Sequence, residues 1–493
     1  MEQWRAVNSS RKLSVLCVIV ALAVVSFSPA GAQSRQPRQP QRAQQQSQAQ
    51  QAQQAERALV ISLDGLDWRY VTAPESTARI PTLRRLMAAG VSAPVMTVYP
   101  SVTYPSHTSI VTGAYPARHG IYGNDIFDPT ILRSREWYWF ANAIKAETLW
   151  DAATSRKLST AMVSWPVATG AGDYNVPEIL KLGGTFPDTL ALIKANARPQ
   201  GLVEEIERAD PKLYAQVNKD EQDDMRTRFA EYIIERKRPQ VMFIHLFDLD
   251  HFQHEHGPFT AEAYAILEKV DAYVARILAA AERAGTLRET AVFIVSDHGF
   301  LPVTKQIQPG VLLAQAGLVN VSEEKNAQGK SRLVVKEWRA LPYTSAGSCA
   351  IFLRDPKDTD ALNRARALFQ TFAKGEATGF PGIGKGSLRV LEARELRALH
   401  AEPRAALMLE AEDGYAFDNN YTGDALTPTN VRGTHGYLPS KYRNTFIASG
   451  AGVTRRGALG GGQPVRLVDL GPTIGNLLQL KLRDADGRAL SLK

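Results

Sequence analysis

Five short runs of apolar residues recur along the chain, and each is apolar almost throughout rather than at every second position. The runs cover residues 58–63, 160–164, 241–246, 291–296 and 445–449. Continuous apolarity is typical of strands that are buried on both faces of a parallel sheet. Helical patterns separate the runs, and alternating strands and helices favour an α/β sandwich with a mostly parallel central sheet.

Three stretches beside these runs show helical signals. Residues 81–89 begin with Pro81 and are followed by Gly90, the usual placing of proline and glycine at helix ends. Residues 260–284 carry apolar side chains at helical spacing, and residues 468–480 show a similar pattern. We therefore expect helices over these three ranges.

Residues from about 310 to 430 follow a different pattern. Glycine and proline interrupt them, their strand-like runs are short, and five glycines fall between positions 375 and 386. We expect an inserted cap here, a small α+β lobe within a catalytic domain that spans residues 57–493. Cys349 lies in one of the strand-like runs, and a buried, unreactive thiol is the role we expect for it.

The N-terminal segment has the composition of an export signal. Basic residues precede an apolar run at 13–27, and Ala-Gly-Ala at 30–32 fits the pattern of a cleavage site. The run has about 15 residues, whereas a membrane-spanning helix needs about 20. We expect residues 1–32 to be a signal peptide. After its removal the chain would have no transmembrane span, and the protein would be periplasmic or secreted. An uncleaved N-terminal anchor is the alternative. Residues 33–56, rich in Gln, Arg, Ala and Ser, are expected to be a disordered linker.

Net charge and cysteine content narrow the classes of function. The formal charge of +8 falls by two when residues 1–32 are removed, because three basic residues and one acidic residue lie there. No cluster of Lys and Arg alternates with aromatic residues, so the sequence does not indicate a dedicated nucleic-acid surface. One cysteine remains outside that segment, which excludes an intramolecular disulfide in the exported chain.

Acidic residues and histidines follow three of the five apolar runs. Asp64 directly follows the first run, Asp250 lies shortly after the third, and Asp297 and His298 directly follow the fourth. Ligand sites in open α/β sheets lie off the carboxyl ends of strands. Any one of these residues alone could cap the next helix, but three such strand ends together indicate a metal site.

Asp250 and His254 are one helical turn apart, and a carboxylate with an imidazole is a common ligand set for Zn²⁺ in hydrolases. Spacing alone does not decide which of the neighbouring residues Asp248, His251 and His256 also bind a metal ion. For His251 and His256 we expect a solvated polar loop instead.

Thr103 lies in residues 98–113, which have the pattern of a nucleophile loop that runs into a helix. A threonine hydroxyl needs a base, a lowered pKa or a metal ion to act as a nucleophile. Pro105 and Ser106 are expected to start a helix whose free N–H groups favour a phosphate. Asn124 would donate an amide N–H to a developing oxyanion. The alternative is a threonine and an asparagine in ordinary turns.

Six motifs in order give the chain a resemblance to a known family. The chain resembles the nucleotide pyrophosphatase/phosphodiesterase family of the alkaline phosphatase superfamily, over residues from Leu59 to about Arg488. The motifs are Ile61-Ser-Leu-Asp-Gly65, Pro100-Ser-Val-Thr-Tyr-Pro-Ser-His107, Thr112-Gly-x-x-Pro-x-x-His-Gly-Ile-x-x-Asn124, Asp250-x-x-x-His254-x-x-Gly-Pro258, Ser296-Asp-His-Gly299 and Gly433-Thr-His435-Gly-Tyr437. Two C-terminal motifs also resemble that superfamily, Val468-Asp-Leu-Gly-Pro-Thr473 and Asp486-Gly-Arg488.

The resemblance implies a fold, two divalent cations and a reaction. The fold would be the three-layer sandwich of the alkaline phosphatases, and the cations would be Zn²⁺. One cation would be held by Asp64, Asp297, His298 and the Thr103 oxygen, and the other by Asp250, His254 and His435. Thr103 would attack phosphorus and form a covalent phospho-enzyme, while Asn124 and one cation would stabilise the equatorial oxygens.

The chain departs from the usual pattern of that family at four positions. Tyr104, Ser106 and Gln253 stand where the family often has Phe, Asn and Gly. Val167 replaces the glycine of a Trp-Pro-Gly motif found in diesterases. None of the four is an expected metal ligand, so these departures bear on substrate preference.

The motifs favour a two-zinc hydrolase of phosphodiester or pyrophosphate bonds in small nucleotide-like substrates. A phosphomonoesterase of the same superfamily is the runner-up; it needs extra cationic contacts, and near Trp165 the chain has Arg156 and Lys157 but no Lys-x-Arg pair. A phosphonate hydrolase on the same scaffold is a further alternative. A sulfatase is disfavoured because the nucleophile position is threonine and no Cys-x-Pro-x-Arg occurs. A non-catalytic binding protein would lack a ligand or the nucleophile, and none is missing.

Overall fold

The computed structural model describes residues 54–131, 136–218, 220–325, 331–459 and 465–493. The predicted signal peptide, 1–32, and almost all of the predicted linker, 33–56, lie outside the described residues. Within the described ranges, no helix combines the length and the apolarity that a membrane crossing requires.

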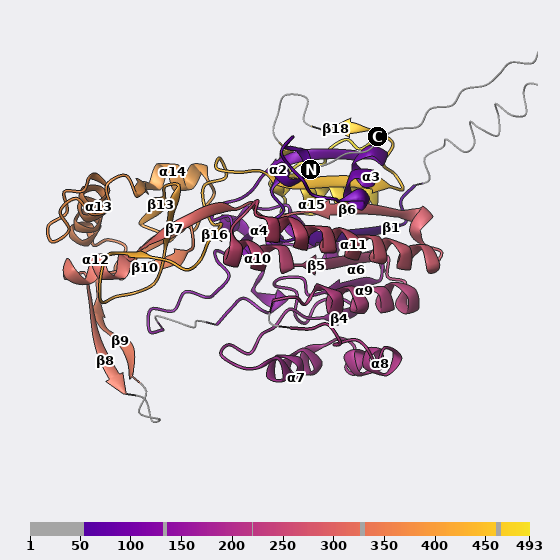
Figure 1. Cartoon of the computed structure of the whole chain (residues 1–493), viewed down its shortest axis with the longest axis horizontal. Helices are drawn as coiled ribbons and strands as arrows, with labels where there is room; N and C mark the ends of the chain where they lie inside the picture. The colour runs from indigo at the N-terminus through magenta and orange to yellow at the C-terminus, as the bar shows by residue number, and fades with distance from the viewer. Residues whose placement is uncertain (1–53, 132–135, 219, 326–330, 460–464) are drawn as a thin grey trace, which may run out of the picture. The chain divides into compact units, whose positions relative to one another are not determined.

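Nine strands of the described chain form the central sheet, in the order β18-β2-β17-β6-β1-β5-β3-β4, with β19 beside β2 (Figure 1). The parallel part consists of β1 (Arg57–Leu63), β3 (Thr160–Val163), β4 (Tyr174–Val176), β5 (Val241–Leu246) and β6 (Thr290–Val295). β1 lies between β5 and β6, with Leu63 opposite Leu246 and Ser62 opposite Val295. The carboxyl ends of these three strands are therefore level with one another.

The other side of the sheet corrects one expectation. It consists of β2 (Val91–Met96), β17 (Asn444–Gly450), β18 (Gly457–Ala458) and β19 (Val465–Arg466). The run at 445–449 was expected in the parallel set, but β17 is antiparallel to both β2 and β6. Continuous apolarity reports burial on both faces, and β17 is buried whichever way it runs. β2 was not predicted, because Ser92 and Pro94 interrupt its apolar pattern.

Helices cover both faces of this sheet and complete three layers. Leu59 and Ile61 of β1 pack into one apolar core with α3 (Pro81–Ala89), α9 (Asp223–Lys237) and α11 (Ala261–Arg283). Ala58 and Val60 of the same strand pack into a second core with α4 (Thr103–Thr112), α6 (Leu149–Ser155) and α15 (Leu470–Leu477). Figure 1 shows α11 beside α9 and beside α10 (Asp248–His256).

The three expected helices are present. α3 matches its predicted range, and α11 is capped by Thr260 and Ala284, the two predicted ends. The third is shorter than expected, since a 3-10 turn precedes α15. The remaining short elements are α2 (Trp68–Thr72), α5 (Pro116–His119), η1 (Ala141–Ala143), α7 (Phe186–Asn196), α8 (Leu202–Ala209), η2 (Leu287–Glu289) and η3 (Leu467–Asp469).

Smaller sheets contain the strands of the stretch that the sequence assigns to an inserted cap, together with two strands, Leu301–Ile307 and Gly433–Thr434, that lie just outside its expected bounds. One is antiparallel and consists of β10 (Ala340–Ser345), β11 (Ser348–Leu353), β13 (Leu407–Ala411) and β12 (Leu388–Leu391). Another consists of β14 (Gly414–Phe417), β7 (Leu301–Ile307), β15 (Leu426–Pro428) and β16 (Gly433–Thr434), and β8 (Val319–Lys325) pairs with β9 (Ser331–Trp338).

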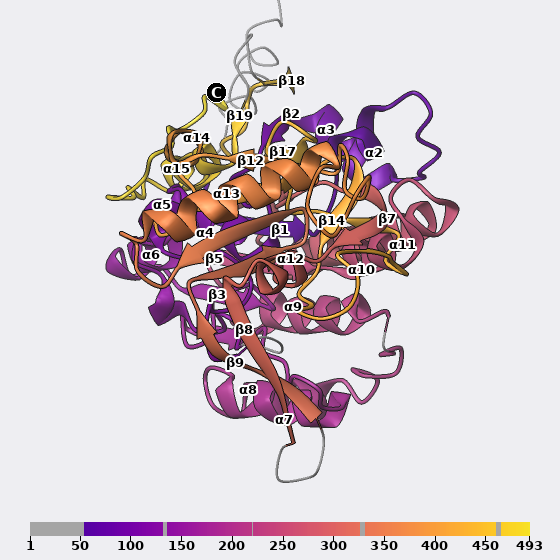
Figure 2. The ribbon, with the colours of Figure 1, turned by 90° about the vertical axis from the view of Figure 1, so that its left-hand side faces the viewer.

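Three helices accompany these sheets, α12 (Pro309–Gln315), α13 (Thr359–Lys374) and α14 (Ala393–Ala398). α13 packs against β12 (Figure 2) and also against β10. Cys349 lies on β11 and is buried in the apolar core of this region, as expected. The elements fit an α+β lobe, while its boundaries at about 310 and 430 stay a prediction.

Candidate active site

The carboxyl ends of the three level strands deliver most of the predicted ligands to one edge of the central sheet. Asp64 directly follows β1, and Asp297 and His298 directly follow β6. β5 leads into α10, which carries Asp250 and His254 one turn apart. The sixth side chain, His435, follows β16, and β16 pairs with β7 just beyond His298.

These side chains lie within a few ångströms of one another. His298 Nε2 lies 3.1 Å from Asp64 Oδ1 and 3.1 Å from Asp297 Oδ2. Asp250 Oδ2 lies 3.5 Å from His254 Nε2, and Asp250 Oδ1 lies 3.6 Å from His435 Nε2. The site therefore has two adjoining groups of ligand atoms, one around His298 and one around Asp250 and His435.

Thr103 is the first residue of α4, and its Oγ1 lies 3.4 Å from His298 Nε2. The helix begins two residues before the predicted start at Pro105. Its first turn also offers fewer free donors than expected, because the Ser106 N–H donates to the Val102 carbonyl at 3.1 Å and the Tyr104 N–H donates to a side chain. The Thr103 hydroxyl is the side-chain group that α4 presents to His298 in the site.

Asn124 accepts that hydrogen bond from the Tyr104 N–H, at 2.9 Å from its Oδ1. The contact fixes the amide beside Thr103 and assigns the oxygen to the protein. The Nδ2 group is then the end that can donate to a ligand.

Burial sets the electrostatics of the site. Burial raises the pKa of Asp64 well above its usual range, and the nearby Asp250 carboxylate raises it further. Burial and the Asp64 carboxylate raise the pKa of Asp297 in the same way. Burial lowers the pKa values of His298 and His435 well below their usual range, and the neighbouring His254 ring lowers both further. The carboxylates therefore need a compensating cation, and neutral imidazole is the form that binds a metal ion.

The polar atoms of this cluster fit divalent cations. Among the residues that the structure describes, Asp64 Oδ1, Asp250 Oδ1 and Asp297 Oδ2 are buried without a hydrogen-bond partner. Two sets of ligand atoms each lie within 4.8 Å of one another, Asp250 with His254 and His435, and Asp64 with Asp250 and His298. Carboxylate and imidazole ligands in such sets are typical of zinc.

Backbone carbonyls orient two of the histidine rings. His254 Nδ1 lies 2.9 Å from the Gly433 carbonyl, and His435 Nδ1 lies 3.3 Å from the Ser101 carbonyl. Each Nδ1 thus carries the proton and each Nε2 is left as a ligand atom facing Asp250. This is the arrangement that metal-binding histidines usually have.

The neighbouring polar residues of α10 lie outside this cluster. His251 and His256 are on a helix, so the expected polar loop was wrong. Leu249 and Phe252 are the two apolar residues of α10, too few to show a helical spacing in the sequence. His251 lies 3.1 Å from Asp220, in a separate group with Glu255.

Sequence reasoning missed His245, which contacts the cluster, and Glu178, which contacts His245. His245 Nε2 lies 2.8 Å from Asp64 Oδ2, and Glu178 Oε2 lies 3.0 Å from His245 Nδ1. A signal existed for His245, because it is the one polar residue of an apolar strand. Glu178 lies in a loop with no pattern that could have revealed it.

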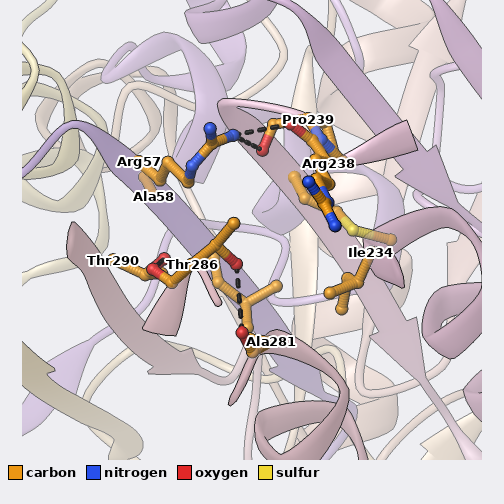
Figure 3. Close-up of a pocket in the computed structure, with 10 residues that line it drawn as sticks. Arg57, Ala58, Ile234, Arg238, Pro239, Ala281, Thr286 and Thr290 are labelled. Carbon is orange, nitrogen blue, oxygen red and sulfur yellow. Dashed lines mark hydrogen bonds between the residues drawn. The ribbon is translucent and has the colours of Figure 1, made fainter. Parts of the chain in front are cut away.

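A cavity of about 230 Å³ adjoins the cluster between the central sheet and the region of β10 and β11. It is lined by Val102, Asn124, Asp125, Thr344, Ser345, Ala346 and His435. A different cavity lies where β1, β5 and β6 begin, lined by Arg57, Arg238 and Thr290 among others (Figure 3). The cavity beside Asn124 and His435 is the one placed to receive a ligand of the cluster.

Comparisons with known proteins agree with this geometry. Residues 58–438 match the family of type I phosphodiesterases and nucleotide pyrophosphatases. Human ectonucleotide pyrophosphatase/phosphodiesterase family member 1 is 28% identical over 251 residues, which is 49% of this chain and 23% of the human protein. Venom phosphodiesterase 2 of Crotalus adamanteus is 22% identical over 250 residues, 49% of this chain and 26% of the venom protein. The match thus spans about a quarter of the length of these two relatives.

Solved structures show the same fold. Human ectonucleotide pyrophosphatase/phosphodiesterase 5 has a TM-score of 0.58 at 16% identity, covering 87% of this chain and 97% of that chain. An inactive murine form of the same protein, in complex with AMP, also has a TM-score of 0.58, at 18% identity. The fold is that of the alkaline phosphatases, and the chain belongs to the type I phosphodiesterase/nucleotide pyrophosphatase family of the alkaline phosphatase superfamily.

Proposed function

We propose that the protein hydrolyses phosphodiester or pyrophosphate bonds in small nucleotide-like substrates, with two divalent cations and Thr103 as the nucleophile. The observation that carries the proposal is the position of the Thr103 hydroxyl, 3.4 Å from Nε2 of His298 in one of the two ligand groups. Family membership supports the type of bond that is cleaved.

Seven side chains would hold the cations. Asp64, Asp297, His298 and the Thr103 oxygen would hold one, and Asp250, His254 and His435 would hold the other. Zn²⁺ is the ion we propose, because the ligands are carboxylates and imidazoles. Two bound cations would supply positive charge at the attacking and leaving oxygens and would favour ionisation of the threonine hydroxyl.

The reaction has two steps. The phosphoryl group is first transferred to Thr103, and the resulting phospho-threonine is then hydrolysed. Thr103 Oγ1 forms a bond to phosphorus as the bond to the leaving alcohol or phosphate breaks. Asn124 Nδ2 donates to a non-bridging oxygen, since Asn124 Oδ1 already accepts from the Tyr104 N–H. Water then cleaves the phospho-threonine and restores the hydroxyl.

The cavity beside Asn124 and His435 is the proposed position of the substrate's alcohol group. Thr344 and Ser345 of β10 bring hydroxyl groups to its wall, opposite the central sheet. Its volume of about 230 Å³ is below that of most drug-sized ligand pockets and suits a compact group. The loop residues around it would set the leaving group.

We also propose that the protein acts outside the cytoplasm, in the periplasm or after secretion. The support is the apolar run at 13–27 with its basic residues and small-residue cleavage pattern. Relatives are named as ectonucleotide and venom enzymes, which fits an exported protein.

Paired assays test the proposed function. Purified protein with added zinc would be given an aryl phosphodiester and an aryl phosphomonoester, beside Thr103→Ala. We expect faster diester hydrolysis that the variant loses. A monoester preference that the variant loses would place the protein with the phosphatases. Hydrolysis that survives the substitution would overturn Thr103 as the nucleophile.

A further inference from the structure

His245 is a buried histidine inside an otherwise apolar strand. It is the fifth residue of β5, between Ile244 and Leu246, and pairs with Ser62 of β1. Its side chain is 1% exposed. A buried polar side chain destabilises a fold unless hydrogen bonds compensate it, so the contacts of His245 indicate why an apolar residue does not stand there.

Both ring nitrogens of His245 face oxygen acceptors. Nε2 lies 2.8 Å from Asp64 Oδ2. Nδ1 lies 3.0 Å from Glu178 Oε2 and 3.1 Å from the Ser164 carbonyl. Carboxylate and carbonyl oxygens accept hydrogen bonds, so a ring nitrogen that carries a proton donates to them, and Nε2–H is the donor that faces Asp64.

The two oxygens of Asp64 have different surroundings. His245 engages Oδ2, whereas Oδ1 lies 3.1 Å from His298 Nε2 and, within the described ranges, has no hydrogen-bond partner. A carboxylate held at one oxygen cannot rotate freely about its Cβ–Cγ bond. Oδ1 is therefore kept toward the ligand cluster.

Glu178 extends the contacts to the nucleophile segment. Its Oε1 accepts a hydrogen bond from the Tyr104 hydroxyl at 2.9 Å, while its Oε2 faces His245. Tyr104 follows Thr103 directly, and its backbone N–H donates to Asn124 Oδ1. One continuous chain of hydrogen bonds thus joins Asp64, His245, Glu178, Tyr104 and Asn124.

We propose that His245 and Glu178 are positioning residues, which hold the Asp64 carboxylate with Oδ1 toward the cation site. The inference rests on the proposed function, because Asp64 is assigned there as a ligand. It adds two residues to that site whose effect is transmitted through Asp64 and which touch neither the substrate nor a cation.

Two substitutions at the same position separate the positioning role from simple packing. The amide nitrogen of glutamine can take the place of Nε2, so His245→Gln keeps the donor to Asp64. The amide nitrogen of asparagine takes the place of Nδ1, so His245→Asn keeps only the contact with Glu178. His119→Asn is the control for loss of a buried histidine, since His119 contacts Ser109 Oγ and the Ile121 N–H instead.

Zinc affinity, measured by competition with a chelator, is the readout beside the melting temperature of each purified variant. We expect His245→Asn to weaken one of two zinc sites by about 10- to 100-fold, as loss of residues that support metal ligands usually does. His245→Gln should bind zinc much more tightly than His245→Asn. The control should keep the affinities of the unsubstituted protein even if its melting temperature falls.

Two results would contradict the inference in different ways. If the unsubstituted protein binds no zinc and hydrolyses no ester, the proposed function fails and this inference fails with it. If that protein binds two zinc ions and His245→Asn binds them equally well, the proposed function stands and the positioning role alone is wrong.

Discussion

The carboxyl and amino ends of the central strands, called here the carboxyl edge and the amino edge of the sheet, differ in whether their buried polar side chains have hydrogen-bond partners. At the edge where β1, β5 and β6 end, Asp64, Asp250 and Asp297 each have a buried oxygen that finds no hydrogen-bond partner among the described residues. At the edge where the same strands begin, an arginine has partners for its donors. A buried polar atom without a partner costs about 1–3 kcal/mol, so it persists where another group binds to it.

Arg57 is the arginine at the amino edge. Its Nε donates to Glu289 Oε1 at 2.6 Å, and its Nη1 donates to the carbonyls of Arg238 and Pro239 at 2.6 and 3.0 Å. Both edges contain charge and a cavity, so neither feature alone identifies a site. Buried carboxylate oxygens without hydrogen-bond partners distinguish the carboxyl edge. At the amino edge the Arg57 donors have partners, which indicates a structural role.

Of the substitutions at the two edges, replacement of the nucleophile should have the largest effect on activity. We expect Thr103→Ala to lower kcat by about 10³-fold or more, because no other hydroxyl is proposed to attack phosphorus. The melting temperature should change little, because the contact of the hydroxyl with His298 is long, at 3.4 Å. Steady-state kinetics and thermal unfolding measure the two effects, with Thr103→Ser as the matched control that keeps a hydroxyl. Turnover by Thr103→Ala at the unsubstituted rate would refute the nucleophile.

Removal of the Asp250 charge should have opposite effects on stability in the absence and in the presence of zinc. In chelator, Asp250→Asn should raise the free energy of unfolding by about 1 kcal/mol, since burial raises the pKa of Asp250 and its charge also raises that of Asp64. With zinc, the unsubstituted protein should gain more stability than the variant, because a ligand that binds the folded state stabilises it. Thermal unfolding under both conditions tests this; an equal gain in both proteins would contradict the ligand role.

The amino edge should behave in the opposite way. We expect Arg57→Met to lower the free energy of unfolding by about 1–2 kcal/mol, because Glu289 and two carbonyls lose their donor. The kcat/KM for an aryl phosphodiester should stay at the unsubstituted value. Chemical denaturation and kinetics on the same preparation measure both. A large fall in kcat/KM in a folded variant would show that the two edges are functionally linked.

Glu410 lies on β13, away from both edges, and it can be compared with the three aspartates because it is a buried acid whose two oxygens both have hydrogen-bond partners. It accepts from the Tyr99 hydroxyl at 3.0 Å and from the Leu438 N–H at 2.7 Å. Burial raises the pKa of Glu410 from 4.5 to about 8. Between these values the folded state holds the proton and the unfolded state releases it, so this group's contribution to stability is complete below pH 4.5 and is lost as pH rises to about 8.

Glu410→Gln should flatten that dependence. The expected change is a loss of slope of at most about 1.4 kcal/mol per pH unit in the free energy of unfolding. Denaturation at a series of pH values between 5 and 8 measures it, with zinc absent in both proteins. Identical slopes for Glu410→Gln and the unsubstituted protein would show that Glu410 does not titrate in this range.

Local patterns predicted much of the fold and the positions of the ligand candidates. Residues 58–63 and 291–296 are apolar because they are buried on both faces, and the first polar residues after them, Asp64 and Asp297, necessarily lie at the sheet edge. That inference needs burial and chain order alone. Binding of metal ions by these residues stays a prediction.

Other features depend on contacts between distant segments. The direction of β17 follows from its pairing with β2 and β6, which its own sequence does not encode. Glu178 and His245 lie 67 positions apart and meet through the packing of a loop against β5. α4 begins at Thr103, two residues before Pro105, because Val102 already has the extended conformation of an N-cap residue.

Anomalous diffraction at the zinc absorption edge, from crystals of the zinc-loaded protein, tests the metal site most directly. We predict two peaks, each about 2.0–2.3 Å from its ligand atoms. One would lie among Asp64, Asp297 and His298, and the other among Asp250, His254 and His435. No peak at these residues, or a single peak beside His251, would contradict the two-cation site.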